Sequence, residues 1–389
     1  MNSEEFKPKK SLLDRYGSKS IIDTGTAKRV WFITDTHLGV RNNSQEWIQI
    51  HSDFFKEWFI PLLKREWRPG DILLHGGDVF DSRQAINLKV LNLGIEIFEE
   101  LAQIFQGEVH IICGNHDIYG KDSNSINSLK PLKLIPGVKV YEEPESVKFG
   151  ETRWLMMPWR KDEAEAKKCL ETFGAHDYLL CHSDFKGLFF NRFTRVEHGI
   201  QEEDLKSYKR VYSGHIHYRQ QRGKINMLGA PYQMTRSDIG NPKGVTLLDL
   251  ASGEETFFEN TYSPRFLKIN FSELLESRPM EITPKIENNF VDILVENDVM
   301  GKIDLARFNS LITGQRSLSF VPVVQTQRTQ VIDGVEVEVP EFTGGTFMFM
   351  DLLKHYLENS TYDEESRNKI FQSIEKIYNK VITPGEDEN

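Results

Sequence analysis

Short apolar runs recur along the first two thirds of the chain, and segments with a different periodicity separate them. Five of these runs have the length of a buried strand, namely residues 30–34, 71–75, 109–113, 178–181 and 210–212. Between the first three runs, apolar side chains recur three and four positions apart over residues 45–66 and 88–105, which predicts two amphipathic helices. Pro61 lies inside the first of these helices, so we expect a kink or break there.

The pattern changes after these five runs. Residues 224–228, 244–250 and 255–259 form three more short apolar runs, which predict a meander of strands. Strands alternating with helices, followed by strands alone, are typical of layered sheets flanked by helices. We therefore predict a mixed α/β fold for this part of the chain.

The pattern also divides the chain into five parts. Residues 1–28 form a polar arm with little periodicity, and residues 29–265 form the main domain, with a hinge at Ser263-Pro264-Arg265. Residues 266–342 mix short strands with prolines, which predicts a small α+β module. A Gly-Gly break follows, and residues 343–382 contain two amphipathic helices, at 347–358 and 363–381, before an acidic tail at 383–389.

Polar motifs directly follow the apolar runs of the main domain. They are Asp35-Thr36-His37, Gly77-Asp78, Gly114-Asn115-His116-Asp117, Cys181-His182 and Gly214-His215-Ile216-His217. In α/β proteins, ligands bind outside the carboxyl ends of the strands. We therefore expect the side chains of the five motifs to gather at one site.

The motifs supply the ligand types that a pair of divalent cations needs. Seven side chains combine carboxylate or amide oxygens with imidazole nitrogens: Asp35, His37, Asp78, Asn115, His182, His215 and His217. This mixture favours Mn²⁺, with Mg²⁺, Fe²⁺ and Zn²⁺ as alternatives. Two cations about 3.5–4 Å apart can clamp the attacking and leaving oxygens of a phosphoryl group and lower the pKa of a bound water to about 7. Asp78 is the candidate carboxylate between the two cations.

His116 is the one histidine of the motifs that no cation needs. A histidine at this place can protonate the leaving oxygen or stabilise the transition state, and Asp117 is placed to orient it. Taken alone, Asp-x-His and Gly-Asp are more often exposed polar loops than metal sites, but five motifs in this order favour a dinuclear metal site. We expect the remaining histidines, including His75 and His198, to be core or surface residues.

Charge and composition change this picture little. A net charge of −10 over 389 residues argues against a broadly basic nucleic-acid surface, although a local basic groove stays compatible with it. Residues 186–195 mix basic and aromatic side chains, so Lys186, Arg192 and Arg195 are candidate DNA contacts. The equal alternative is that this loop packs over the catalytic face. Arg41 and Asn42, just after the first motif, are further candidates for phosphate contacts.

The cysteines and the apolar runs bear on where the protein works. Three cysteines are too few for a disulfide framework, which fits a reducing cytoplasm. No apolar run approaches the about 20 residues of a membrane span, and the N-terminal segment lacks the apolar region of a secretory signal. We expect a cytoplasmic protein of a bacterium or a phage-infected host cell, with no membrane partner.

In its five motifs the chain resembles the calcineurin-like metallophosphoesterase superfamily, over about residues 29–264. The resemblance implies a four-layer α/β/β/α sandwich. It also implies that Asp35, His37, Asp78 and His217 hold one metal and that Asp78, Asn115, His182 and His215 hold the other. His116 is then the catalytic acid.

Within that superfamily the chain is most similar to the SbcD-type DNA repair nucleases, through residues 34–39, 77–83, 213–217 and 228–233. The similarity implies a metal-dependent exonuclease or endonuclease with a capping, DNA-binding domain at residues 266–342. It also implies that the helical segment 343–382 binds an SbcC-type coiled-coil ATPase, and that the protein forms a homodimer. One departure is Asp81, because some relatives carry a histidine three residues after the bridging aspartate.

Two other functions compete with this one. Protein phosphatases of the same superfamily usually carry Gly-Asp-x-x-Asp-Arg-Gly and Gly-Asn-His-Glu, whereas this chain has Ser82-Arg83 after Asp81 and Asp117 after His116. Cyclic nucleotide phosphodiesterases share the motifs but do not need residues 266–381. A non-catalytic structural subunit is the third alternative, which the complete ligand set disfavours.

Overall fold

The computed structural model describes residues 22–23, 25, 27–120, 123–296, 315–323, 325–332, 335–342, 363–364 and 366–372. The chain divides into two units, Met1–Arg265 and Phe266–Asn389, and each is described here by itself. Within the described ranges, no helix is both long and apolar enough to cross a membrane.

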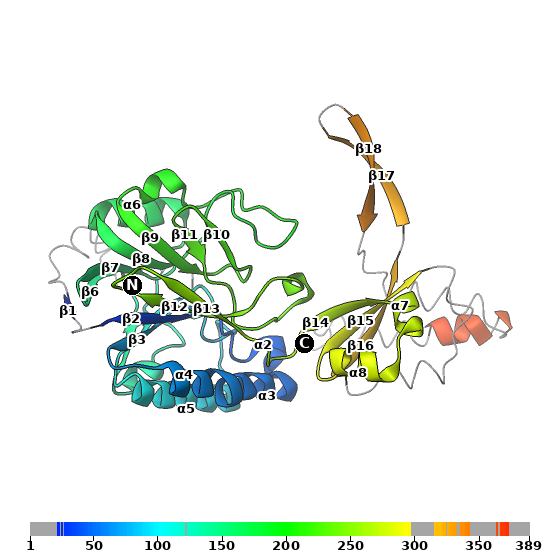
Figure 1. Ribbon diagram of the computed structural model, residues 1–389, viewed down its shortest axis with the longest axis horizontal. Coiled ribbons are helices and arrows are strands. Elements are labelled where there is room, and N and C mark those ends of the chain that lie inside the picture. Colours follow the sequence, from blue (N-terminus) through cyan, green and yellow to red (C-terminus); the bar gives the residue numbers. More distant parts are fainter. Residues whose placement is uncertain are drawn as a thin grey trace, which may run out of the picture. The chain divides into compact units, whose positions relative to one another are not determined.

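A six-stranded sheet forms one half of the first unit (Figure 1). Four parallel strands make up most of it, and two antiparallel strands extend one edge. The order across the sheet is β13 (Glu255–Glu259), β12 (Gly244–Asp249), β2 (Arg29–Ile33), β3 (Asp71–His75), β4 (Val109–Ile112) and β5 (Val138–Tyr141).

A seven-stranded sheet forms the other half. Its order is β1 (Ile22–Asp23), β6 (Glu145–Phe149), β7 (Thr152–Met157), β8 (His176–His182), β9 (Tyr208–Gly214), β11 (Ile225–Met227) and β10 (Gln220–Arg222). β7, β8, β9 and β11 are parallel, whereas β6 runs antiparallel to β7 and β10 runs antiparallel to β11. β1 pairs with β6, so two residues of the expected N-terminal arm belong to the sheet.

The expected single meander at residues 224–259 is wrong, because its strands belong to different sheets. β11 pairs with β9 and β10 in the seven-stranded sheet. β12 instead pairs with β2 and β13 in the six-stranded sheet. Apolar periodicity identifies a strand but does not identify its partner, because both sheets bury strands of the same composition.

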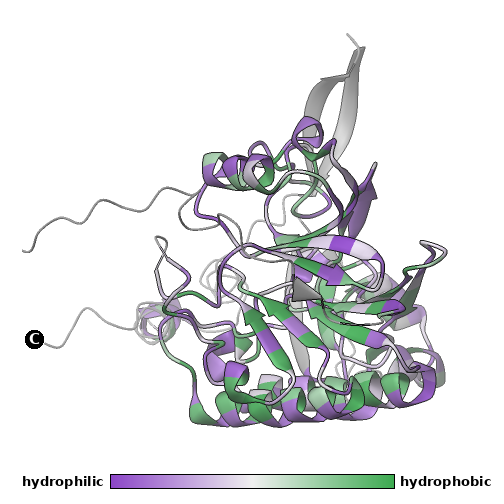
Figure 2. Cartoon of the chain, turned by 90° about the vertical axis from the view of Figure 1, so that its left-hand side faces the viewer, coloured by the Kyte–Doolittle hydropathy of each residue, from purple (hydrophilic) through white to green (hydrophobic). Residues whose placement is uncertain are grey.

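Side-chain alternation along the strands builds two cores. Trp154 and Met156 of β7 face the six-stranded sheet and pack in one core with Phe32 of β2. Leu155 and Met157 of the same strand face the other way and pack with Cys169 of α6 (Glu163–Phe173). Figure 2 shows apolar residues both in the strands and in the flanking helices. The predicted α/β fold, with helices flanking layered sheets, is confirmed.

The helices α3 (Gln45–Asp53), α4 (Ile60–Glu66) and α5 (Leu88–Ile104) cover the outer face of the six-stranded sheet (Figure 1). The expected kink in the first helix takes the form of a π-helical segment, η1 (Phe54–Phe59), directly before Pro61. The Ile60 N–H bonds the Phe55 carbonyl. Because a proline ring clashes with the carbonyl four residues earlier, a wider turn at this point lets the chain pass Pro61 without ending the helix.

Short helical segments complete the connections of the first unit. They are α2 (Val40–Asn43), η2 (Leu132–Leu134), η3 (Glu202–Leu205) and η4 (Arg236–Asp238). Cys113, Cys169 and Cys181 are buried free thiols, and burial raises the pKa of Cys169 and Cys181 to about 12. These cysteines are therefore packing residues.

The second unit contains a parallel three-stranded sheet and a separate two-stranded one. Its elements are β14 (Phe266–Asn270), α7 (Phe271–Glu276), α8 (Pro279–Ile286), β15 (Phe290–Glu296), β16 (Ser317–Val323), β17 (Gln325–Ile332) and β18 (Val335–Phe342). Residues 364 and 366–372 are helical. The predicted helix at 347–358, the rest of the helix at 363–381 and the acidic tail lie outside the described residues.

Candidate metal centre

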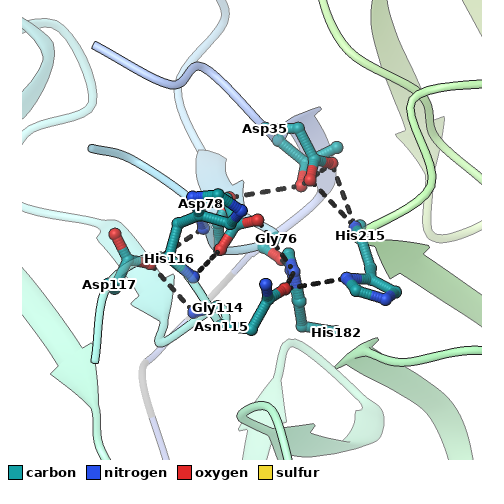
Figure 3. Close-up of polar contacts among 12 residues, drawn as sticks. Asp35, Gly76, Asp78, Gly114, Asn115, His116, Asp117, His182 and His215 are labelled. Carbon is teal, nitrogen blue, oxygen red and sulfur yellow. Dashed lines mark hydrogen bonds and ion pairs between the residues drawn. The ribbon is translucent and has the colours of Figure 1, made fainter. Parts of the chain in front are cut away.

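The five polar motifs meet where strands of both sheets end (Figure 3). Each motif lies at or just after the carboxyl end of β2, β3, β4, β8 or β9. Since parallel strands end on the same side, their following loops converge. Asp35, His37, Asp78 and His182 are buried, whereas His116 and His215 are partly exposed.

The backbone of these loops is held in a conformation that L-residues rarely adopt. The φ angles are 52° at Asp35, 42° at His37, 55° at Asp78 and 87° at His215. Left-handed non-glycine residues cluster at functional sites, where the surrounding structure holds the strain. Four of the seven predicted ligands have this backbone.

Two glycines of the motifs serve different purposes. Gly77 has a φ of 96°, which L side chains rarely tolerate. Gly114 has no positive φ, but a Cβ there would lie 2.2 Å from Asp78 Oδ1. At Gly114 the requirement is instead space for the Asp78 carboxylate.

The ligand atoms form three clusters that share members. One contains Asp35, His37 and His217, a second contains His37, Asp78 and His116, and a third contains Asp78, His182 and His215. Asp78 Oδ2 lies 3.6 Å from His37 Nε2 and 3.2 Å from His182 Nε2. The Nε2 atoms of His37 and His217 are 3.1 Å apart. Ligand atoms that each lie about 2.1 Å from one cation are separated by such distances.

Asn115 joins the third cluster. Its Oδ1 atom lies 2.9 Å from His182 Nε2 and 2.8 Å from His215 Nδ1. Asp35 holds the backbone of His215, because its carboxylate accepts the His215 N–H at 2.9 Å. All seven predicted ligands therefore lie within one connected group of side chains.

The imidazoles are oriented as in a metal site. His37 Nδ1 donates to Asp81 Oδ1 at 3.1 Å, and His182 Nδ1 donates to the Gly76 carbonyl at 2.7 Å. Both rings therefore turn Nε2, the atom that would bind a cation, towards the centre. A histidine ligand usually has its second nitrogen fixed in this way by an oxygen outside the metal shell.

The charges of the centre are strongly coupled. Burial disfavours the ionised Asp78, but nearby His182 and His37 outweigh it and hold the pKa of Asp78 well below its usual value. Burial likewise opposes the charged form of His182, yet the Asp78 charge and hydrogen bond raise its pKa to about 9. Burial and the neighbouring His37 lower the pKa of His217 to about 4. Buried carboxylates among imidazoles thus attract positive charge, and divalent cations would provide it.

His116 is oriented by a group other than the one we expected. Its Nδ1 donates to the backbone carbonyl of Asp81 at 2.7 Å, and its backbone N–H donates to Asp78 Oδ1 at 2.7 Å. The Nε2 atom stays available to a substrate. Burial lowers the pKa of His116.

Asp117 was expected to orient His116, but its hydrogen bonds go elsewhere. Its carboxylate accepts the backbone N–H groups of Asp78 at 2.8 Å and Gly114 at 2.9 Å. It also accepts those of Val79 and Phe80. Burial and the nearby Asp78 charge raise the pKa of Asp117 to about 6. The hydrogen bonds of the Asp117 carboxylate therefore connect the second motif to the third.

His75 connects the first two motifs, which the sequence did not reveal. The Gly77 N–H donates to His75 Nδ1 at 3.2 Å, so His75 Nε2–H donates to Thr36 Oγ1, also at 3.2 Å. Burial lowers the pKa of His75 to about 3, which keeps this ring neutral. The hydroxyl of Thr36 in turn donates to the Val79 carbonyl.

Asp81 and Asp184 are further residues of the site that the sequence analysis did not assign. Asp184 Oδ1 lies 3.2 Å from His215 Nε2. Each aspartate lies two or three residues after a predicted ligand, and this spacing is the only sequence signal for them. A buried ion pair also supports the last motif, because Lys243 contacts Asp238 at 2.7 Å and donates to the His217 carbonyl.

The predicted DNA contacts occupy two exposed segments of the first unit. Arg41 and Asn42 lie in the left-handed turn of α2, and the Arg41 guanidinium donates to the Met234 carbonyl at 3.1 Å. Lys186, Arg192 and Arg195 are exposed in the loop between β8 and β9.

Comparison with known proteins gives a family match over the part of the chain that contains the centre. Residues 28–219 match the family model of the calcineurin-like phosphoesterases. The chain is also 27% identical over 323 residues to exonuclease subunit 1 of Enterobacteria phage T4, covering 77% of this chain and 91% of that protein.

Solved structures show weaker likenesses. An archaeal phosphodiesterase is 13% identical, with a TM-score of 0.32, covering 60% of this chain and 99% of the other. A cold-active protein-tyrosine phosphatase of a psychrophilic Shewanella species is 12% identical, with a TM-score of 0.28, covering 62% and 83%.

Proposed function

This chain carries a calcineurin-like phosphoesterase domain at residues 28–219, and from that premise we propose that it is a metal-dependent DNA nuclease. The observation that carries the proposal is the shared position of Asp78 between two clusters of ligand atoms. One carboxylate reaching both clusters is the arrangement that a pair of cations needs for cleaving a phosphodiester.

In this proposal the seven ligand side chains bind two cations. Asp35, His37, Asp78 and His217 bind the first, and Asp78, Asn115, His182 and His215 bind the second. When bound, the two cations supply an activated water and neutralise charge on the phosphoryl group. Mn²⁺ is the metal that this donor set favours, because it accepts both oxygen and imidazole ligands.

The residues around the cations complete the chemistry. His116 has its Nδ1–H fixed on the Asp81 carbonyl, so the second proton of the doubly protonated ring lies on Nε2, where it can be given to the leaving oxygen. Burial lowers the pKa of His116, which makes its protonated form a stronger acid. Arg41, Lys186, Arg192 and Arg195 contact DNA phosphates.

The choice of DNA as the substrate is supported by the extent of one likeness. The alignment with the phage exonuclease subunit covers 77% of the chain, so it continues beyond the phosphoesterase domain. That relative is named as a subunit. The partner proposed here is a coiled-coil ATPase of the SbcC type bound through residues 343–382, in a complex that processes DNA breaks with two copies of this chain.

Purified protein, Mn²⁺ and linear DNA test the nuclease activity directly. Cleavage of DNA in preference to cyclic nucleotides is expected, and a His116→Ala variant should bind Mn²⁺ but not cleave. A protein that hydrolyses cyclic nucleotides and leaves DNA intact, both alone and with the ATPase, contradicts the proposal. Copurification of the tagged chain with a coiled-coil ATPase tests the complex.

A further inference from the structure

A loop that starts beside the metal centre carries exposed aromatic and basic side chains at its tip. It lies between β8 and β9 (Figure 1), and we call residues 186–195 the 186–195 hairpin. Two backbone hydrogen bonds close its base. The Lys186 N–H donates to the Ile200 carbonyl at 3.1 Å, and the Ile200 N–H donates to the Asp184 carbonyl at 3.0 Å. Asp184 is the residue whose carboxylate contacts His215, so the hairpin begins at the wall of the site.

The arms of the hairpin are rigid. Val196 N–H donates to the Leu188 carbonyl at 2.8 Å, and both side chains are buried in the core beneath the sheet. Gln220 of β10 clamps the Phe189 backbone twice, accepting its N–H at 2.9 Å and donating to its carbonyl at 2.6 Å. The side chains of Leu188 and Val196 are therefore buried, and the backbone N–H and C=O groups of Phe189 have hydrogen-bond partners within the protein.

The tip is held in one conformation as well. Asn191 Oδ1 accepts the backbone N–H groups of Phe193 at 2.9 Å and Thr194 at 3.0 Å. The Phe190 N–H donates to the Thr194 carbonyl at 2.9 Å. Such an Asx turn fixes the direction of the residue that follows it.

The side chains that this turn presents are Phe193, which is 86% exposed, and Phe190, which is 44% exposed. Single exposed apolar side chains are common and mean little alone. Here the Arg192 guanidinium lies 5.7 Å from the Phe193 ring centroid, and Arg195 lies 5.2 Å from that of Phe189. Exposed aromatic rings thus alternate with cations on a rigid tip.

The charge of the hairpin is opposite to that of the chain. It contains Lys186, Arg192 and Arg195 and no acidic residue, whereas the whole chain has a net charge of −10. A local basic segment on an acidic protein attracts phosphates without a general affinity for polyanions. Rings and cations in this combination are the features that bind single-stranded nucleic acid.

We propose that Phe193 stacks on an unpaired base of the DNA substrate while Arg192 and Arg195 contact the adjoining phosphates. The inference rests on the proposed nuclease function and narrows its substrate class to DNA with a single-stranded segment. Phe193 is a binding residue in this role, and it takes no part in the chemistry at the metals.

Fluorescence anisotropy of the full chain tests the stacking, in a His116→Ala background that prevents cleavage. The probes are a single-stranded oligonucleotide, an abasic oligonucleotide of the same length and a blunt duplex. Phe193→Ala should weaken binding of the single strand about tenfold, while Phe193→Trp preserves it, because any aromatic face can stack. Binding of the abasic strand should not change.

Leu134→Ala is the matched control, because Leu134 is 84% exposed on η2 and should affect no probe. Equal weakening on the base-containing and abasic strands overturns the inference, and so does unchanged binding of every probe. A change in sedimentation without any change in DNA binding would identify the tip as a protein interface, which also overturns it.

Two measurements on the unmutated chain separate this inference from the proposed function. If that chain cleaves DNA and only the Phe193 prediction is wrong, the nuclease assignment stands. If it hydrolyses bis-p-nitrophenyl phosphate but neither binds nor cleaves DNA, the nuclease assignment itself fails.

Discussion

At the scale of single residues, the orientation of the imidazoles decides what the centre can do. His37, His116 and His182 each donate from Nδ1 to an oxygen, and each keeps Nε2 for the site. Asp81 is central to this order, since its carboxylate holds His37 and its carbonyl holds His116. The two functions use different atoms of one residue, so mutation can separate them.

The His116→Ala variant should lose cleavage while it keeps the metals. We expect the rate of DNA cleavage to fall about 10²- to 10⁴-fold, because a positioned general acid contributes that much. Mn²⁺ binding, measured by calorimetry, should stay near that of the unmutated chain. His198→Ala changes an exposed histidine outside the centre and is the control. A His116→Ala variant that cleaves DNA at the full rate would remove this residue from the chemistry.

The Asp81→Asn variant should instead affect metal binding. The substitution removes the charged acceptor of His37 Nδ1–H but leaves the backbone carbonyl that orients His116. Loss of such an outer-shell partner typically weakens metal binding about 10- to 100-fold. Activity titrated with Mn²⁺ should therefore shift to higher metal concentration and reach nearly the same maximum. A reduced maximum with an unchanged metal requirement would contradict this separation.

At the scale of elements, the centre consists of loops that follow strand ends. Hydrogen bonds from Asp117 and His75, which are not among the proposed ligands, connect these loops to one another. Asp117 binds backbone N–H groups of the loop after β3 and of the loop after β4. His75 binds Thr36 after β2 and Gly77 after β3. These ties hold Asp35, His37 and Asp78 in left-handed backbone that they would not adopt in isolation.

Replacement of Asp117 by Ala should therefore destabilise the fold as well as the site. At least three buried N–H groups would lose their acceptor, and each such loss costs about 1–3 kcal/mol. We expect urea denaturation to show a loss of about 3 kcal/mol or more in the free energy of unfolding.

Asp177→Ala is the comparison for this variant. Asp177 also accepts a backbone N–H, from Arg153 at 2.8 Å, but in a solvent-exposed setting, so its loss should cost less than about 1 kcal/mol. Equal stabilities of the two variants would show that the Asp117 hydrogen bonds do not hold the loops.

At the scale of the whole molecule, the metal centre belongs to the first unit. All seven proposed ligands precede Arg265, and so do all strands of the two large sheets. Both cores of these sheets are also completed by residues before Arg265. The second unit has its own sheets, and within the described residues the groups that could hold a cation all come from the first unit.

A chain ending at Arg265 should thus keep the basic chemistry and lose the later steps of DNA processing. We expect its hydrolysis of bis-p-nitrophenyl phosphate to stay within about threefold of the full chain, a change of less than 1 kcal/mol in the activation barrier. Copurification with the ATPase should disappear. Circular dichroism controls for folding, and a folded but inactive truncation would show that the second unit completes the centre.

The sequence predicted most of the first unit because its signals are local. The strands around residues 30, 73 and 111 and the helix at 88–105 follow directly from periodicity, and the structure confirms them. The π-helical turn before Pro61 was not predictable in this form, since α- and π-helical segments bury nearly the same positions. The pairing of residues 244–259 with the first sheet depends on contacts far apart in the sequence.

The sequence by itself determined which side chains could bind metal. Both the type of ligand atom and its position after a predicted strand can be read directly from the order of residues. It also determined the α/β fold, through the alternation of apolar periods. Only the tertiary structure decided which oxygen orients each imidazole. Asp81 replaced Asp117 as the partner of His116, and His75 became part of the site, because hydrogen bonds between loops depend on how the sheets pack. The same packing fixes the 186–195 hairpin beside the centre with Phe193 at its tip.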